Sequence, residues 1–243
     1  AFASFQSLGT LGAWLAVLGY TFQLYFDFSG YSTMAVGLGF MFGLRLPQNF
    51  NSPYKALNPS DFWQRWHISL STVLRDYLYI PLGGNRGGTW FVYRNLMITM
   101  LLGGLWHGAA WTFVLWGAYH GALLIGYKMT QSWWDSWNMQ FQRILTFGLV
   151  IVGWVLFRSE TFEVAVNMLG RMFAWSPGTT VPGEGLAVAA IVLAAWWSMG
   201  WKNPFEFKYT WSYRQTALLG LSAGAALAII LSNRASPFLY FQF

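Results

Sequence analysis

Charged residues divide the chain into long apolar intervals. The 243 residues contain 14 Lys and Arg and 8 Asp and Glu, and the intervals between them are rich in Leu, Ala, Phe and Trp. A charge at the centre of a lipid-facing helix costs about 2.5 to 3.5 kcal/mol, so charge-free intervals are candidates for membrane-spanning helices. The candidates are residues 1–26, 28–44, 95–127, 144–157, 185–201 and 215–233.

The interval 95–127 predicts a helix that breaks and turns back. As one helix it would be about 50 Å long, and two full crossings would need about 40 residues. We therefore expect two half-length helices that meet near mid-membrane. If the chain reverses there, eleven of the fourteen Lys and Arg fall on one side, which fits the preference of basic residues for the cytoplasm. This arrangement places His107, in "GGLWHGAAWT", at the turn.

Residues 45–94 are polar enough to lie outside the lipid core yet rich in aromatic residues, and they predict an amphipathic helix at the cytoplasmic interface. Asn58 is expected to cap it, with Pro59 at its first position and Asp61 at its third. The apolar stripe recurs every three or four residues and comprises Trp63, Trp66, His67, Leu70, Leu74 and Tyr77. Pro81 and the glycines after it end the helix.

Two further segments complete the organisation. Residues 163–173 predict a second, weaker amphipathic helix, and residues 176–185 predict a loop. No internal repeat or domain-scale linker separates parts of the chain. We therefore expect residues 1–243 to form a single membrane domain, with 45–94 as a cytoplasmic segment within it.

Composition strengthens the membrane interpretation. Hydrophobic residues make up 56% and charged residues 9%, whereas an ordinary soluble domain is about 25% charged. Phe, Trp and Tyr contribute 20%, which suits aromatic belts at two membrane interfaces. The predicted fold class is an all-α polytopic membrane protein, with broken helices around a central cavity.

Composition also excludes several kinds of chemistry. The chain has no Cys, which rules out disulfides, thiolate metal sites and a cysteine nucleophile. We expect no metal site and no bound cofactor. The net charge of +6 comes from basic residues scattered between apolar intervals, so it indicates membrane topology and not nucleic-acid binding.

The three histidines are the main candidates for chemistry, because imidazole can take a proton from a hydroxyl near neutral pH. His107 lies in "GLWHG" and His120 in "GAYHG", and GxxxG spacing lets membrane helices pack closely. For His107 we favour a position lining a cavity, and for His120 a packing role. His67 lies on the apolar side of its helix, and both a site role and a structural role stay open.

Other polar residues are candidates for substrate contacts. Asp27, in "YFDFSGYS", either caps the following helix or serves the site. Arg75, Asp76 and Arg86 could meet an anionic donor such as a pyrophosphate group, or lipid headgroups. Trp106 directly precedes His107. The phrase "PLGGNRGG" lacks the spacing of a nucleotide-binding loop, so it is a weak phosphate motif.

Four long phrases resemble the membrane-bound O-acyltransferase family: "YFDFSGYSTMAVGLG", "RLPQNFNSPY", "DFWQRWHISLSTVLRDYLYIPLGGNR" and "LLGGLWHGAAWTFVLWGAYHG". They are most similar to its bacterial branch that acetylates alginate and other exopolysaccharides. The resemblance implies that His107 is the catalytic histidine and that His67 occupies the second signature position. Thr33 stands where the family phrase would have Asp, so no role of that carboxylate is carried over.

The resemblance also implies a reaction and a location. It implies transfer of an acyl group, in particular acetyl, from a cytoplasmic thioester such as acetyl-CoA to a hydroxyl on the periplasmic side of the bacterial inner membrane. The acceptor is a polysaccharide or a periplasmic hydrolase-like protein that relays the acetyl group. Family members are longer, so we expect this chain to be the C-terminal half of one and to need its N-terminal half.

Three alternatives remain open at this stage. The first is transfer of D-alanyl or another acyl group within the same family. The second is a transporter, since broken helices and intramembrane polar groups also build transporters. The third is a scaffold of a polysaccharide secretion complex. Transport predicts flux of an unchanged solute, catalysis predicts thioester consumption that depends on His107, and a scaffold predicts neither.

Overall fold

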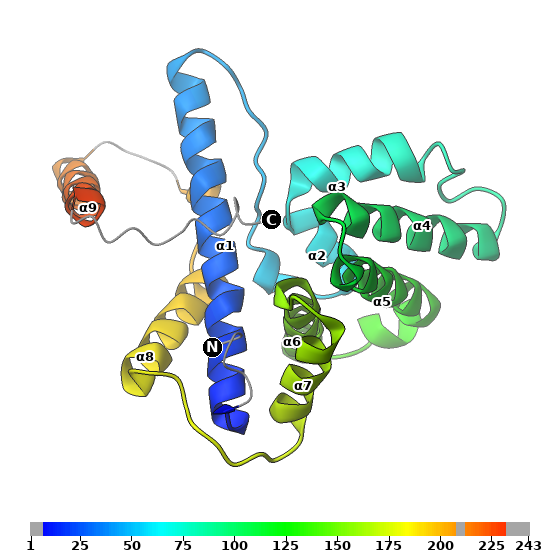
Figure 1. Ribbon diagram of the computed structural model, residues 1–243. Coiled ribbons are helices and arrows are strands. Elements are labelled where there is room, and N and C mark those ends of the chain that lie inside the picture. The colour runs from blue at the N-terminus through cyan, green and yellow to red at the C-terminus, as the bar shows by residue number, and fades with distance from the viewer. Residues whose placement is uncertain (1–6, 208–211, 232–243) are drawn as a thin grey trace.

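The computed structural model describes residues 7–207 and 212–231, and regular structure in these ranges is helical apart from one isolated β-bridge between Leu8 and Thr179. The prediction of an all-α fold is confirmed for this part of the chain. Its α-helices are α1 Thr10–Met41, α2 Pro59–Arg65, α3 Ile68–Leu74, α4 Thr89–His107, α5 Trp111–Asp135, α6 Met139–Arg158, α7 Phe162–Phe173, α8 Glu184–Ala195 and α9 Tyr213–Leu231 (Figure 1).

α1 is one continuous helix of 32 residues, drawn in blue in Figure 1. It joins the predicted intervals 1–26 and 28–44, so the suggested helix cap at Asp27 is wrong. Asp27 lies in the interior of α1 and is half-exposed. A single charged side chain leaves the backbone hydrogen bonds of a helix intact, and so the charge did not mark an end.

α4 and α5 form the predicted hairpin. The helices are separated only by residues 108–110, and His107 is the last residue of α4. The backbones touch at two glycines, because a Cβ built on Gly104 would lie 2.3 Å from the carbonyl oxygen of Phe113, and one on Gly117 would lie 2.3 Å from that of Met100. The break at His107 and the reversal of the chain are therefore confirmed.

The predicted half-length of these helices is wrong. α4 has 19 residues and α5 has 25, with a kink at Thr130. Both helices continue past the charges that bounded the apolar interval, since Arg94 lies within α4 and Lys128 within α5. Arg94 remains in the helix by directing its guanidinium to the Leu82 carbonyl oxygen at 3.3 Å and to the neighbouring Asn95 side chain.

The segment 45–94 begins its helix as predicted but does not continue as one stripe. Asn58 Oδ1 accepts a hydrogen bond from the Asp61 backbone N–H at 2.8 Å, and Pro59 is the first residue of α2. α2 ends at Arg65, and His67 adopts a left-handed backbone conformation with φ 45° and ψ 56° before α3 begins. The turn interrupts the predicted apolar stripe, and Tyr77, its last member, is 79% exposed.

The cap at Asn58 gives a prediction about stability. Asn58→Ala removes the acceptor of the Asp61 N–H and is expected to destabilise the protein by about 1 kcal/mol, because an unsatisfied N-cap costs about that much. Asn58→Asp keeps the acceptor and should unfold at nearly the wild-type temperature. Thermal unfolding in detergent compares the two variants, and an equal loss in both would contradict the capping explanation.

α6 packs at the centre of the described helices. Trp154 is 1% exposed, and its ring lies 4.7 Å from Trp66 and 5.8 Å from Phe157. Met168 and Met172 of α7 pack against Ile151 and Val155 of α6. This buried face agrees with the amphipathic helix predicted at 163–173. Among the described residues, α6 is the helix that is both long and apolar enough to cross a membrane, and the apolar stretch Glu184–Gly200 is shorter.

The remaining predicted segments agree with the structure where it describes them. The loop between α7 and α8 crosses the start of α1, where the Gly9 and Thr10 N–H groups donate to the Thr179 and Ser176 carbonyl oxygens at 3.0 and 2.9 Å. α8 continues into the π-helix η4 (Trp196–Gly200) and matches the interval 185–201. α9 matches 215–233, whose last two residues lie outside the described ranges.

Candidate functional site

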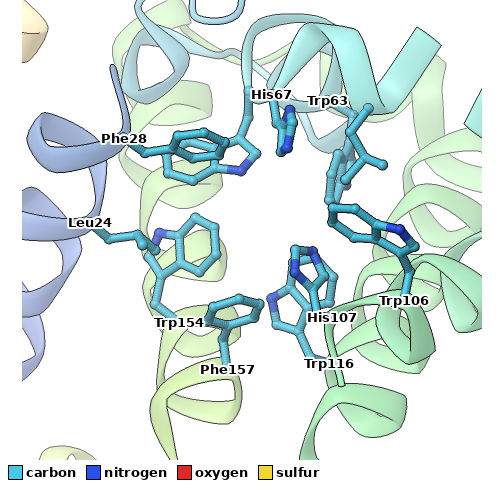
Figure 2. Close-up of a pocket in the computed structure, with 11 residues that line it drawn as sticks. Leu24, Phe28, Trp63, His67, Trp106, His107, Trp116, Trp154 and Phe157 are labelled. Carbon is cyan, nitrogen blue, oxygen red and sulfur yellow. The ribbon is translucent and has the colours of Figure 1, made fainter. Parts of the chain in front are cut away.

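A pocket of about 320 Å³ lies between α1, the α2–α3 turn, the end of α4, and α5 and α6 (Figure 2). Its volume is at the lower end of the range for small-molecule sites. Among the residues that the structure describes, its lining is apolar and aromatic apart from two histidines and includes no Asp, Glu, Lys or Arg. The lining residues are Leu24, Phe28, Trp63, Trp66, His67, Leu70, Trp106, His107, Trp116, Trp154 and Phe157.

His107 is held in this pocket by aromatic rings. The imidazole meets the rings of Trp116 and Phe157 edge-on, at centroid distances of 5.3 and 5.0 Å, and that of Trp106 at 5.1 Å. Within the described residues its ring nitrogens form no hydrogen bond with the protein, so both are available to a substrate. The hairpin turn after α4 determines this position, because His107 is where the helix ends.

His67 lies across the pocket from His107 (Figure 2). Its Nδ1 is 3.1 Å from Asn49 Oδ1, and its ring meets the Phe28 ring edge-on at 4.7 Å. Its Nε2 is buried and has no hydrogen-bond partner in the part of the chain that the structure describes. Burial, and then the nearby His107, lower the pKa of His67 to about 4, so the ring is neutral at pH 7.

Comparison with known protein families supplies the context for this pocket. Residues 3–159 match the family described as MBOAT, membrane-bound O-acyltransferase family, which is more than half of the chain. The chain belongs to the membrane-bound O-acyltransferase family. The resemblance inferred from the four sequence phrases is therefore confirmed, and those phrases all lie within the matched range.

Individual members of the membrane-bound O-acyltransferase family show the same relationship. The chain is 45% identical to a probable alginate O-acetylase, AlgI, of Pseudomonas putida over 98% of this chain and 55% of that protein. It is 50% identical to a peptidoglycan O-acetyltransferase of Helicobacter pylori over 68% of this chain and 32% of that protein. It is 33% identical to a teichoic acid D-alanyltransferase of Bacillus subtilis over 63% of this chain and 42% of that protein. The chain thus spans about half the length of the alginate relative.

The other predicted site residues of this acyltransferase-family chain are not all in the pocket. Trp106 lines it and is 60% exposed. His120 is 1% exposed and lies behind the pocket wall, 4.9 Å from the Trp116 ring, so the structure places it in packing. Asp27 is one residue before Phe28 on α1 but is not among the lining residues.

The basic candidates lie outside the pocket. Arg75 and Asp76 are exposed and pair with each other, with Nε and Oδ1 2.7 Å apart. Arg86 is exposed in the loop before α4. Arg75 also lines a second pocket, of about 470 Å³, together with hydroxyl-bearing residues of α3 and α4; Trp63 lines both pockets and separates them.

Sequence reasoning missed several residues that shape the site. Asn49 was read only as part of "RLPQNFNSPY", yet its side chain contacts His67. Trp116, Trp154 and Phe157 were not singled out from the sequence but form the wall around His107. The indole N–H groups of Trp63 and Trp116 are buried without a partner among the described residues, so they are available donors next to the pocket. No local sequence signal distinguishes such residues from ordinary core aromatics.

Proposed function

We propose that this chain carries the acyl-transfer site of a membrane-bound O-acetyltransferase. The observation that supports this most strongly is the placement of His107 and His67 on opposite walls of one apolar pocket, to which the described part of the chain contributes no Asp, Glu, Lys or Arg. In such surroundings a neutral imidazole has no competing carboxylate and can serve as a proton acceptor.

The proposed reaction uses His107 as general base. His107 takes the proton of an acceptor hydroxyl while the hydroxyl oxygen attacks the thioester carbonyl carbon. The new C–O bond forms, the C–S bond breaks, and the proton on His107 passes to the departing thiolate. The products are an ester and a free thiol, and His107 returns to its neutral form. His67 positions or polarises the thioester.

The donor is proposed to approach from the side of residues 45–94. The second pocket combines hydroxyl groups, including those of Ser71 and Thr99, with the guanidinium of Arg75. Apolar residues, including Leu74, Leu96 and Met100, form much of the rest of this lining, and the Arg75 guanidinium is paired with Asp76. We propose that an acyl carrier such as the coenzyme A part of acetyl-CoA occupies this pocket, because the shared wall at Trp63 would bring the carrier next to His67 and His107. Arg86 and Asp76 lie on the same segment.

The acceptor and the location are proposed from the named relatives. One is named for alginate and another for peptidoglycan, both of them polysaccharide-containing polymers outside the cytoplasm. We propose a hydroxyl on the periplasmic side, in an exopolysaccharide such as alginate or on a hydrolase-like relay protein. The chain would then cross the bacterial inner membrane several times and function together with the rest of the full-length enzyme.

One alternative has a specific observation behind it. A relative at 33% identity is named teichoic acid D-alanyltransferase, whereas the two O-acetyl relatives described above are 45 and 50% identical. D-alanyl transfer is therefore second to O-acetyl transfer. A transporter or a scaffold of a secretion complex has no comparable support.

The test is thioester consumption by native membranes that contain the protein. With acetyl-CoA, we expect release of free CoA together with acetyl esters on the extracytoplasmic polymer, and neither product from membranes that lack the protein. Transport of an unchanged solute without CoA release would indicate a transporter. Activity with a D-alanyl thioester and none with acetyl-CoA would favour the second candidate.

A further inference from the structure

The side-chain amide of Asn49 has a defined orientation. Its Oδ1 accepts hydrogen bonds from the backbone N–H of Ser69 at 3.1 Å and from the Ser69 hydroxyl at 3.0 Å, while its Nδ2 donates to Ser32 Oγ at 3.3 Å. A backbone N–H can only donate, so the atom of the amide that faces it must be the oxygen. The chemistry therefore settles which end of the amide is which.

The same oxygen determines where the hydrogen of His67 lies. Asn49 Oδ1 is 3.1 Å from His67 Nδ1, and a carbonyl oxygen has no proton to give. The Ser69 hydroxyl is also near, 3.4 Å from Nδ1, but it donates to Asn49 Oδ1 at the shorter distance of 3.0 Å, so the hydrogen between Nδ1 and Oδ1 belongs to Nδ1. A neutral imidazole has one N–H, which leaves Nε2 with a free lone pair. Nε2 is the buried atom without a partner in the described residues, and Figure 2 shows a nitrogen of this ring directed toward the pocket centre.

We infer that Asn49 is a positioning residue for acyl transfer, which fixes His67 in its Nδ1–H tautomer and so makes Nε2 a hydrogen-bond acceptor for the substrate. This inference rests on the proposed function and narrows it. His67 cannot donate from Nε2 to the thioester carbonyl, so it does not polarise the donor. It accepts a hydrogen bond from an O–H or N–H of the bound substrate.

Asn49 also holds the backbone at this position. His67 has φ 45°, a left-handed conformation that is unfavourable for a residue other than glycine. Asn49 accepts hydrogen bonds from the next two backbone N–H groups. The Ile68 N–H donates to the Asn49 backbone oxygen at 2.9 Å, and the Ser69 N–H donates to the Asn49 side-chain oxygen. One residue thus holds both the strained turn and the ring that the turn places in the pocket.

Few titratable groups surround His67, so the effect of a carboxylate introduced at position 49 on the pH dependence of activity can be interpreted. Within the described ranges, the titratable side chains that line the pocket are His67 and His107. The faces of α1, α5 and α6 toward the ring contribute Leu24, Phe28, Trp116 and other apolar groups, and Asp27 of α1 is not part of the lining. In the Asn49→Asp variant, the groups expected to titrate at this site are therefore these two rings and the new carboxylate itself.

The experiment compares Asn49→Leu and Asn49→Asp in native membranes by CoA release. Asn49→Leu removes the group that holds the hydrogen of His67 on Nδ1. It is expected to lower kcat by about 10- to 100-fold, which is the effect of losing a residue that orients a histidine ligand in metalloenzymes. Asn49→Asp keeps an acceptor at Nδ1 and should retain most of the activity. Its carboxylate stabilises imidazolium, so activity should be lost at a pH about 1 to 2 units higher than in the wild type.

The matched controls are Asn51→Leu and Asn51→Asp. Asn51 lies two residues along the same loop and is also half-buried, but its Oδ1 accepts from Asn203 Nδ2 at 3.0 Å and does not contact His67. These variants should leave the pH profile in place. The inference is overturned if Asn49→Leu loses no more kcat than Asn51→Leu, or if Asn49→Asp has the acid limb of the wild type.

A spectroscopic measurement separates this inference from the proposed function. In ¹⁵N NMR of the labelled protein, the signal that disappears in His67→Gln should show a protonated Nδ1 and an unprotonated Nε2. A protonated Nε2 at neutral pH overturns the inference even if the enzyme is active. Wild-type membranes that release no CoA would instead overturn the proposed function, while the NMR result would still test the contact between Asn49 and His67.

Discussion

His107→Ala is expected to reduce acyl transfer by about 10²- to 10⁴-fold, which is the contribution of a well-placed general base. His107 is the ring in the pocket whose nitrogens are both free of hydrogen bonds with the described part of the protein, and its neighbours Trp116 and Phe157 offer no group that could replace it. The rate of CoA release per folded molecule in native membranes measures the effect. Wild-type polymer acetylation by the variant would refute the assignment.

The fold is expected to survive this substitution. His107 is only half-buried and is the last residue of α4, so alanine there leaves no sealed cavity and breaks no helical hydrogen bond. The matched control is His120→Ala, on the neighbouring helix. His120 is 1% exposed and lies in contact with the rings of Trp63 and Trp116, so its loss should lower the unfolding temperature more than that of His107 does.

The position of His107 could be predicted from the sequence because it depends on local features. The apolar interval 95–127 was too long for one crossing and too short for two, and the distribution of basic residues favoured a chain reversal near His107. The prediction erred on helix length because it took charges as helix ends, whereas Arg94 binds the Leu82 carbonyl oxygen within α4. The same assumption divided α1 at Asp27.

The partner of His67 could not be predicted in this way. The periodicity from Trp63 to Tyr77 indicated one helix, and nothing in that pattern shows that His67 takes a left-handed conformation. The turn is held by Asn49, 18 residues earlier, through contacts that exist only after the loop has packed against α3. Contacts of this kind leave no spacing rule in the sequence, and the aromatic wall from α5 and α6 is equally non-local.

Gly117→Ala is expected to prevent the hairpin from forming as observed. A Cβ at Gly117 would lie 2.3 Å from the carbonyl oxygen of Met100, and this contact is with backbone that no rotamer change can move aside. Overpacking a tight contact costs about 1 to 3 kcal/mol, and more where the backbone must shift. Because Met100 and His107 belong to the same helix, separating α4 from α5 also displaces the His107 ring, so activity and thermal stability should fall together.

Gly126→Ala is the matched control for this prediction. Gly126 lies on the same helix, and a Cβ there would meet nothing within 4 Å. Alanine favours the helix over glycine by about 0.5 to 1 kcal/mol, so this variant should be as stable as the wild type or slightly more stable. Unfolding temperature and CoA release, measured on the two variants side by side, decide the matter. Equal stability of both would show that α4 and α5 do not require backbone contact, and that the position of His107 depends on something other than the glycine seam.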